Sequence, residues 1–401
     1  MGAGCSRNAG QPSDAPKITK GVPGDAPSVR SQPDSEESSS VHNYSQYGHL
    51  KQEDEGDLAN LTPQQLFARE ARSRRLTERI GEGRLSPDAN EDAESAVDPD
   101  SLHHFRFSEN LVLSTGKKNV VKAHVAYQSQ EGQEPGYRKS NQDTCFCKSN
   151  LSGTQRALFG VFDGHGPNGH HVSAFVKDNL PSYVGAHSLF REYPGQALKE
   201  SFQTTHDRLM STRIDCEFSG CTAAAVLLDK KTVYCAWAGD TRVVIGRVCD
   251  DGKFETVGLT VDHKPDLPGE KMRIEKMKGR VARLQDENGN PVGPNRVWLK
   301  YAWVPGLAMS RAIGDGLACR VGITCEPDVN QYEISAEDKY LIMASDGLWE
   351  FLTNEEAVAI VAECTTPEQA CDILVEKSRE RWLREEDGVV DDITVLVVFF
   401  P

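Results

Sequence analysis

The sequence predicts an α+β fold from about residue 119 onward. Short runs that are apolar or rich in β-branched residues predict strands at 157–162, 221–228, 232–239, 241–248, 339–345 and 393–400. Several are apolar throughout, as expected for strands that are covered on both faces. Helical patterns lie between them at 168–183, 194–212 and 268–278, with two more within 353–384. Consecutive strands such as those in 232–248 favour antiparallel pairing over strict βαβ alternation.

Residues 1–118 have a different composition, rich in Ser, Pro, Gly, Asp and Glu and poor in aromatic residues. Stretches such as "PDANEDAESAVDPD" cannot bury enough apolar area to offset chain entropy, so we expect disorder there. One island at 62–80 predicts a short helix, with Thr62 as the cap, Pro63 at the first helical position and Gln65 at capping-box spacing. A solvated helix is the simpler interpretation, and a regulatory or docking helix is the alternative. The globular domain is therefore 119–401.

Charge and cysteine content exclude several classes of protein. The net charge of -15 argues against electrostatic binding of nucleic acid. No apolar segment is long enough to span a bilayer, and no charged and apolar start marks a secretory signal. The 11 cysteines are then most simply reduced thiols in the cytosol, and their spacing does not match a structural zinc site.

Aspartates fall where predicted strands begin or end. Asp163, Asp240 and Asp346 follow apolar runs, Asp143 precedes "TCFCK", and Asp391 with Asp392 precedes the last strand. Any one of them has a plain alternative as a turn residue, because Asp-Gly is a common turn dipeptide. Five such sites together would repel one another unless cations lay between them. A set of oxygen ligands favours Mg²⁺ or Mn²⁺ over zinc.

The segment 164–169 also matches G-x-G-x-x-G, which raises the alternative of a dinucleotide site. Pro167 lies in the loop that would close on the pyrophosphate, and Asp163 would place a negative charge beside two phosphates. No second nucleotide-binding half follows. The sequence therefore favours a metal site at this turn.

Eight segments in order resemble the metal-dependent serine/threonine protein phosphatases of type 2C. They are "RKSNQD" at 138–143, "VFDGHG" at 161–166, "SGCTA" at 219–223, "AGDTR" at 238–242, "DHKP" at 262–265, "LAMSRAIGD" at 307–315, "SDGLWE" at 345–350 and "DDITV" at 391–395. Each motif alone is modest, but eight in one order are specific. The resemblance implies two central antiparallel sheets packed face to face with helices outside, a four-layer α-β-β-α sandwich.

The resemblance also implies a centre of two Mg²⁺ or Mn²⁺ ions. Asp163 would bridge the ions, the carbonyl of Gly164 would bind one, and Asp346 with Asp391 would complete the other. Asp143 would act nearby, directly or through a water. Asp240 matches the acidic residue that the family associates with a third, weaker ion, and Glu350 would assist there, although many relatives carry Asp at that position.

Two further residues would act on the substrate. Arg138 would hold the phosphate, since its guanidinium fork matches phosphate oxygens, and His165 would be the general acid for the basic alkoxide that leaves. A solvated loop cation and a turn residue are their simpler alternatives. Gln142 stands where many members carry Glu, so one ion would rely more on water.

The implied function is hydrolysis of phosphoserine and phosphothreonine in proteins by water activated between two ions, without a covalent nucleophile. The alternative is a catalytically weak or inactive binding protein on the same fold, and a metal-dependent phosphodiesterase is a third option. The segment 280–306 resembles the family's variable flap, in which Trp298 and Trp303 either contact substrate or pack structurally. We expect phosphorylated protein substrates and a monomer.

The start of the chain, "MGAGCS", matches the N-myristoylation pattern, with Gly2 as acceptor and Ser6 in place. Cys5 is a candidate for palmitoylation, which would make anchoring stable because one myristoyl chain binds membranes only marginally. The alternative is an unmodified disordered start. We therefore expect the protein on the cytoplasmic face of a membrane, with a cytosolic pool.

Overall fold

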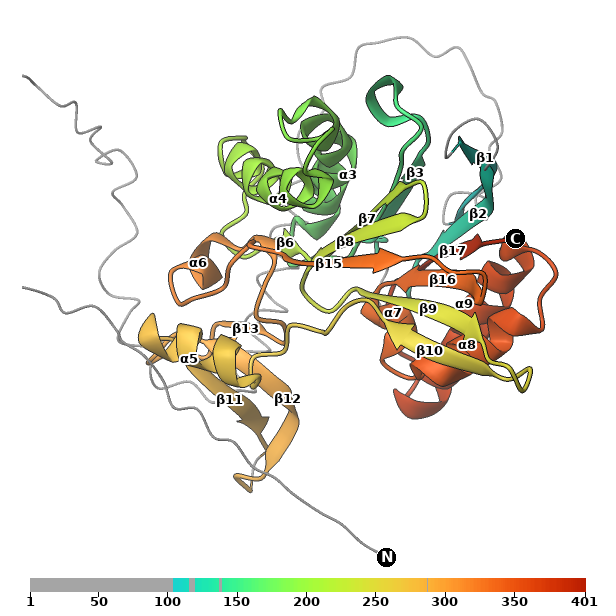
Figure 1. The fold of residues 1–401 in the computed structure, drawn as a ribbon. Coiled ribbons are helices and arrows are strands. Elements are labelled where there is room, and N and C mark those ends of the chain that lie inside the picture. Colours follow the sequence, from blue (N-terminus) through green and yellow to red (C-terminus); the bar gives the residue numbers. More distant parts are fainter. Residues whose placement is uncertain (1–103, 115–119, 137–138, 287) are drawn as a thin grey trace, which may run out of the picture. The chain divides into compact units, whose positions relative to one another are not determined.

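The structure is a computed structural model that describes residues 104–114, 120–136, 139–286 and 288–401. Two antiparallel sheets packed face to face lie at its centre, and helices cover their outer faces (Figure 1). The predicted two-sheet sandwich is therefore confirmed.

The first sheet has six strands. They are β1 (His104–Ser114), β2 (Val120–Gln130), β9 (Arg242–Val248), β10 (Phe254–Gly258), β16 (Asp338–Ala344) and β17 (Ile393–Phe399). Their order across the sheet is β1-β2-β17-β16-β9-β10, and every neighbouring pair is antiparallel. The chain thus contributes three pairs of consecutive strands to this sheet, β1 with β2, β9 with β10, and β16 with β17, and strands of the other sheets lie between these pairs in the sequence.

The second sheet has five strands. They are β3 (Thr144–Lys148), β4 (Ala157–Phe162), β7 (Ala223–Asp229), β8 (Thr232–Ala238) and β15 (Asp328–Glu333), in the order β15-β8-β7-β4-β3. Two short sheets accompany it. One contains β5 (Gly164–His165), β6 (Gly220–Cys221) and β14 (Ile313–Gly314), and the other contains β11 (Arg280–Gln285), β12 (Pro291–Trp298) and β13 (Pro305–Leu307).

Among the described residues, the five longer helices lie close to their predicted ranges, whereas the short helices at 316–319 and 346–349 and the 3₁₀ turn at 151–153 were not predicted. The helices are α3 (Gly169–Ala186), α4 (Pro194–Met210), α5 (Pro268–Lys276), α6 (Gly316–Cys319), α7 (Asp346–Trp349), α8 (Asn354–Ala362) and α9 (Pro367–Glu385), with a 3₁₀ turn η2 (Leu151–Gly153). The start of α8 is fixed by a capping box, in which Thr353 Oγ1 accepts from Glu356 N and Glu356 Oε2 accepts from Thr353 N. Helix α9 begins with Pro367 after the capping residue Thr366.

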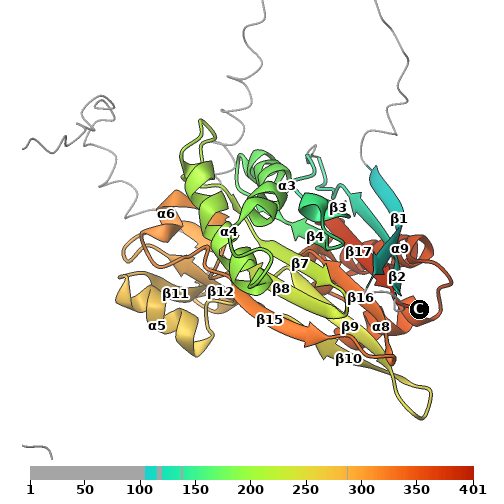
Figure 2. The same ribbon diagram turned by 45° about the horizontal axis from the view of Figure 1, so that its top comes forward.

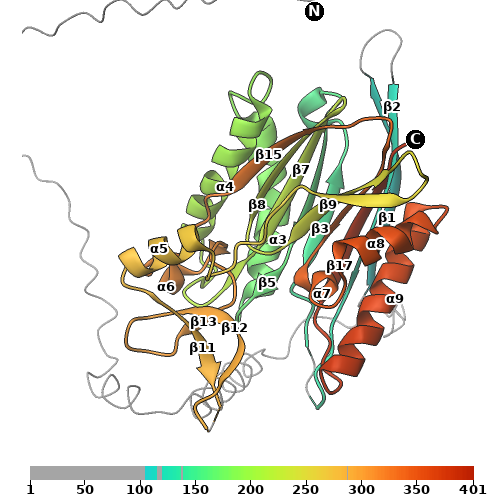
Figure 3. The same ribbon diagram turned by 60° about the horizontal axis from the view of Figure 1, so that its bottom comes forward.

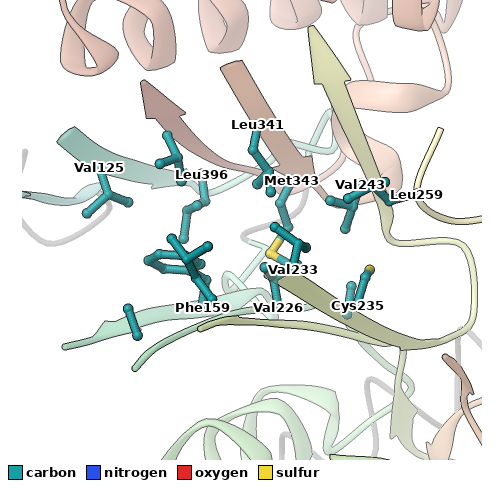
Figure 4. Close-up of a cluster of buried hydrophobic side chains, with 14 of the residues drawn as sticks. Val125, Phe159, Val226, Val233, Cys235, Val243, Leu259, Leu341, Met343 and Leu396 are labelled. Atoms are coloured by element: carbon teal, nitrogen blue, oxygen red, sulfur yellow. The ribbon is translucent and has the colours of Figure 1, made fainter. Parts of the chain in front are cut away.

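Alternation along the strands divides the core into layers. In β4, Phe159 and Val161 point into the space between the sheets, whereas Leu158 and Phe162 point towards the helices. Figure 4 shows the inter-sheet layer, where Phe159 and Val226 of one sheet face Leu341, Met343 and Leu396 of the other. Because both faces of these strands are buried, they read as continuous apolar runs in the sequence.

The two helical layers cover opposite sides of the sandwich. Helices α3 and α4 pack on the five-stranded sheet (Figure 2), and α7, α8 and α9 pack on the six-stranded sheet (Figure 3). No helix in the described ranges combines the length and apolar character that a bilayer crossing needs. Ten cysteines in these ranges are free thiols, most of them buried.

Strand β1 lies N-terminal to the predicted domain boundary at 118/119. It pairs along its whole length with β2, from His104 opposite Gln130 to Ser114 opposite Val120. The predicted acidic N-terminal region, 1–118, includes these residues, "HFRFSENLVLS". The structure instead uses them as an edge strand of the six-stranded sheet. The predicted helix at 62–80 and the rest of 1–103 lie outside the described residues.

Glu270 connects α5 to the segment between β13 and β14, which contains Ser310 and Arg311. Its side chain is buried and accepts hydrogen bonds from Arg273 at 2.7 and 2.8 Å, from Ser310 Oγ at 2.5 Å and from Arg311 Nη2 at 2.8 Å. Burial raises the pKa of Glu270, but these donors outweigh burial and lower the pKa to about 2. A buried carboxylate with this many donors stabilises the folded state as long as it stays ionised.

We predict that Glu270→Gln lowers the free energy of unfolding at pH 7 by about 2–3 kcal/mol. The folded-state pKa lies below the ordinary value of 4.5, so the stabilisation is fully present above about pH 4.5 and is lost as the pH falls towards 2. Denaturant unfolding at pH 7 and in acid checks this, because the difference between wild type and variant must shrink in acid. Glu275→Gln on the same helix is the matched control, since Glu275 is exposed and its variant should cost less than about 0.5 kcal/mol.

Candidate active site

Antiparallel register brings the aspartates of the five-stranded sheet to one edge. Thr144 at the start of β3 pairs with Phe162 at the end of β4, so Asp143 and Asp163 lie beside each other. The start of β7 pairs with the end of β8, and Asp240 follows β8 at that same edge. Three aspartates from distant parts of the sequence therefore meet at the ends of neighbouring strands.

The six-stranded sheet contributes two more aspartates. Ala344 at the end of β16 pairs with Val395 near the start of β17, so Asp346 and Asp391 lie at one end of this pair. Asp346 is the first residue of α7, which turns away from the strand at this point. A hydrogen bond of 2.7 Å from Ser345 Oγ to Asp143 Oδ2 joins the two sheets. The five strand-end aspartates thus belong to a single site.

The pKa values of these carboxyl groups reflect their burial and their nearness to one another. Burial raises the pKa of Asp143, Asp163 and Asp346, and repulsion between the carboxylates of the site raises each further. The pKa of Asp346 reaches about 7, with burial, Asp391 and Asp240 as its main causes. Asp163 and Asp346 lie within hydrogen-bonding reach of each other. This set of carboxylates is therefore unfavourable unless positive charge lies among them.

Two lysines supply positive charge at the site. Lys139 forms an ion pair with Asp391 and lies 3.4 Å from Asp392, and Lys264 forms an ion pair of 2.5 Å with Asp240. Burial lowers the pKa of Lys139, but the neighbouring aspartates outweigh burial and raise it. In the part of the chain that the structure describes, no three His, Cys, Asp or Glu side chains converge on one point at metal-ligand distances.

Asp392 holds the segment that carries Asp143 in place. It is buried, and its two oxygens accept from Gly132 N at 2.7 Å and from Gln142 N at 2.8 Å. It therefore ties the loop between β2 and β3 to the start of β17. Of the two aspartates in the DDITV motif, Asp391 remains more accessible and Asp392 is committed to the backbone.

The loop after Asp163 depends on close backbone packing. A Cβ added at Gly164 would lie 2.5 Å from both Gln142 O and Gly169 O, so only glycine fits there. Gln142 Nε2 donates to Gly166 O at 2.8 Å. A glutamate could not donate this bond, so Gln142 stabilises the loop. The glycines of the G-x-G-x-x-G segment therefore allow this close backbone packing.

His165 is paired with a carboxylate that the sequence analysis did not assign. Its Nε2 lies 2.8 Å from Asp315 Oδ2, and Asp315 is almost fully buried. Because a carboxylate only accepts, Nε2 carries the hydrogen. Among the described residues, the buried Nδ1 has no hydrogen-bond partner. Burial lowers the pKa of His165, but Asp315 outweighs burial, so the net shift of this pKa is upward.

Glycine at position 220 makes room for the pair of His165 and Asp315. A Cβ at Gly220 would lie 2.1 Å from Asp315 Oδ2 and 2.9 Å from His165 Nε2. Asp315 N also donates to Ser219 O at 2.8 Å, which holds the carboxylate against this strand. The signal was present in the sequence, because Gly220 and Asp315 stand inside the SGCTA and LAMSRAIGD motifs.

The remaining predicted residues have different outcomes. Arg138, Gly2 and Cys5 lie outside the described residues. Trp298 is buried, donates to Ala282 O at 2.9 Å and packs edge to face on Trp303, so it is a structural residue of the flap. The role of Arg138 in phosphate binding remains a prediction, as do the roles of the aspartates and of exposed Glu350 in metal binding. Sequence reasoning did not assign Lys139, Lys264, Ser345 or Asp392, although each lies within or beside a quoted motif.

The chain is similar in sequence to known proteins. Residues 127–385 match the family model of protein phosphatase 2C. The chain is 37% identical over 276 residues to "Probable protein phosphatase 2C 64" of Oryza sativa subsp. japonica, covering 66% of this chain and 64% of that protein. It is 32% identical over 325 residues to "Probable protein phosphatase 2C 73" of Arabidopsis thaliana, covering 73% of this chain and 86% of that protein. The chain thus spans less than two thirds of the rice protein.

A solved structure has the same fold. The crystal structure of serine-threonine phosphatase 2C from Toxoplasma gondii aligns with a TM-score of 0.61 at 23% identity, over 74% of this chain and 99% of that one. The segment matched by the family model contains four of the five strand-end aspartates and both members of the pair of His165 and Asp315. On this evidence from sequence and fold, the chain belongs to the protein phosphatase 2C family.

Proposed function

We propose that the protein hydrolyses phosphoserine and phosphothreonine in other proteins and depends on Mg²⁺ or Mn²⁺. The observation that carries this proposal is the meeting of five strand-end aspartates at one edge of the sandwich, beside a histidine paired with a buried carboxylate. The proposal includes two ions, held mainly by Asp163, Asp346 and Asp391. A third, weaker ion would lie at Asp240.

The donor set fits hard divalent cations. The five aspartates supply only carboxylate oxygens. Mg²⁺ and Mn²⁺ prefer such oxygen ligands to thiolate or imidazole. Asp240 Oδ1 is buried and has no hydrogen-bond partner among the described residues. Burial and then the neighbouring carboxylates raise the pKa of Asp143 and of Asp163, so positive charge among them would favour their ionised forms. Gly164 would add its carbonyl oxygen to the set.

The protein's own residues would orient the substrate. Bound cations supply an acidified water and neutralise charge on the phosphoryl group. Arg138 would hold phosphate oxygens with its guanidinium fork. Lys139 stands next to it in sequence and is already anchored at Asp391 and Asp392.

His165 would protonate the leaving oxygen of serine or threonine. Nearby cations would disfavour an imidazolium, whereas Asp315 accepts the Nε2 hydrogen and favours the charged ring, which would oppose that effect. The proton for the leaving oxygen would then reside on Nδ1, the ring nitrogen that has no partner among the described residues. Asp315 is a positioning residue in this scheme.

The proposal extends to the location of the protein. The start "MGAGCS" supports myristoylation at Gly2, and Cys5 offers a second acylation site. Two acyl chains give stable anchoring where one does not. The protein would then act as a monomer on phosphoproteins at the cytoplasmic face of a membrane, with a cytosolic pool.

We predict strict dependence of turnover on divalent metal. Hydrolysis of a phosphothreonine peptide should require Mg²⁺ or Mn²⁺ and stop after chelation. Asp163→Asn and Asp346→Asn should each lower kcat at saturating metal by at least about 100-fold, because each removes charge from the site that binds both ions. Asp240→Asn should cost less, since it affects only the weaker ion.

Asp251→Asn is the matched control for these variants, because Asp251 is exposed in the turn between β9 and β10, at the end of β9 opposite to Arg242, which pairs with Ala344 beside the site. It should keep the wild-type rate. Full activity after exhaustive chelation would contradict the mechanism. A folded wild-type protein without turnover at any metal concentration would instead support the inactive binding protein.

We predict that His165→Ala is sensitive to the leaving group. A p-nitrophenolate ion leaves without protonation, whereas a threonine alkoxide does not. The variant should therefore lose about 100-fold in kcat on a phosphothreonine peptide but less than about tenfold on p-nitrophenyl phosphate. Asp315→Asn should show the same pattern more weakly. His171→Ala, an exposed histidine nearby in sequence, is the control. Equal losses on both substrates would make His165 a structural residue.

We predict that Gly2→Ala moves the protein from membranes to the cytosol, because myristoylation requires an N-terminal glycine. Cys5→Ser should weaken anchoring while leaving myristate in place, since the second acyl chain is lost. Cell fractionation and mass spectrometry of the native N-terminus check both results, with Ala3→Gly as a control that keeps Gly2. A native N-terminus without any fatty acyl group would refute the claim.

A further inference from the structure

A cavity of about 340 Å³ lies between the start of α5 and the flap strands β11 and β12. Its lining includes Lys264, Asp266, Arg283 and Asn295, with the backbone at 293–294. Lys264 also forms the 2.5 Å ion pair with Asp240. The cavity therefore adjoins the edge where the strand-end aspartates meet. Its volume exceeds what a single charged side chain needs.

The polar groups of the cavity are not all engaged. Asp266 accepts a hydrogen bond from Asn295 Nδ2 at 3.2 Å, so its charge is partly compensated within the lining. Arg283 Nε donates to Gly293 O at 2.6 Å, which fixes the guanidinium against the flap turn. Neither terminal nitrogen of Arg283 has a hydrogen-bond partner among the described residues. A positioned guanidinium with free donors is suited to a carboxylate or a phosphate.

The surroundings reinforce this preference for anions. The segment 271–311 carries nine Lys or Arg against three Asp or Glu, a net charge of +6 in a chain of net charge -15. The exposed members in the described part include Lys271, Lys276, Lys278 and Lys300. A basic region on an acidic protein attracts anionic ligands to that face.

We infer that this cavity is a subsite for an anionic side chain of the substrate, a glutamate, an aspartate or a second phosphorylated residue near the phosphate that is removed. The inference rests on the proposed phosphatase activity and names the substrate class of that site. Lys264 connects the two places, because it contacts Asp240 on one side and lines the cavity on the other. An extended peptide advances about 3.3 Å per residue, so a residue a few positions away can reach the cavity.

Asp266 sets a limit on this subsite. Its carboxylate lies in the same lining and repels an incoming anion. The affinity of the subsite for an anion therefore depends on attraction by Lys264 and Arg283 and on repulsion by Asp266. Arg283 is therefore a specificity-determining residue. Removing its charge should change the choice among substrates and leave the chemical step intact.

The test uses the full chain with Mn²⁺ and a set of phosphothreonine peptides. Glutamate or phosphoserine replaces alanine in turn at each position within about four residues of the phosphothreonine, and kcat/KM is measured. Wild type should prefer the best acidic peptide over the alanine peptide by about tenfold. Arg283→Gln should reduce this preference to below about twofold, Arg283→Lys should restore part of it, and Asp266→Asn should increase it.

Lys300→Gln is the matched control, because it removes the same charge from the flap outside the cavity and should keep the preference. Comparison of glutamate with phosphoserine peptides identifies which anion the subsite takes. Equal kcat/KM for all peptides with wild type, or equal effects of Lys300→Gln and Arg283→Gln, would overturn the inference. Hydrolysis of p-nitrophenyl phosphate should be the same in all variants. Its absence in wild type would mark a failure of the proposed function instead.

Discussion

Repulsion between carboxylates is the constraint on which the rest of this structure depends. Five aspartates from five chain segments are held at one sheet edge, where burial and mutual repulsion raise the pKa of at least three of them. Such a set does not assemble by its own attraction. The pairing of β3 with β4 and of β16 with β17 enforces it, with the inter-sheet core holding the two sheets together. Lysines and hydroxyl donors then offset part of the cost.

The hydrogen bonds around the site follow from the same constraint. Ser345 Oγ donates to Asp143 across the gap between the sheets, and Thr222 and Thr241 share a bond of 2.6 Å between neighbouring turns. Both carboxylate oxygens of Asp392 accept hydrogen bonds from backbone amides. The bond from Ser345 orients the Asp143 carboxylate, and the other bonds hold the chain segments next to the aspartates. Rigid support of this kind is what a site needs when its ligands repel one another.

The region around the flap is basic, whereas the neighbouring site is acidic. Lys264 contacts Asp240 at the carboxylate edge and also lines the cavity beneath the flap, so it stands between an acidic and a basic region. Glu270 anchors α5 through Arg273 and Arg311, which places the basic region firmly beside the site. A substrate with separated negative charges would meet both regions at once. Cation binding and substrate selection would thus share a boundary at Lys264.

Local sequence was sufficient to predict much of the fold. Runs that are apolar on both faces, such as 157–162 and 393–400, predicted strands of a covered sheet, and periodic segments predicted the main helices. Aspartates at the ends of these runs predicted a metal site, and eight ordered motifs indicated the family. These signals are local, because they depend on residues adjacent in the chain. The edge strand β1 was not predicted, since its stability comes from pairing with β2 rather than from its composition.

Only the tertiary structure decided which polar groups meet. The pairing of His165 with Asp315 joins residues 150 positions apart, and no spacing in the sequence specifies it. The same holds for Lys139 with Asp391 and for Lys264 with Asp240. Strand register and loop packing set these distances to within hydrogen-bond length. The sequence by itself determined which chemical groups are available, and the fold determined their partners, because long-range contacts depend on how the two sheets stack.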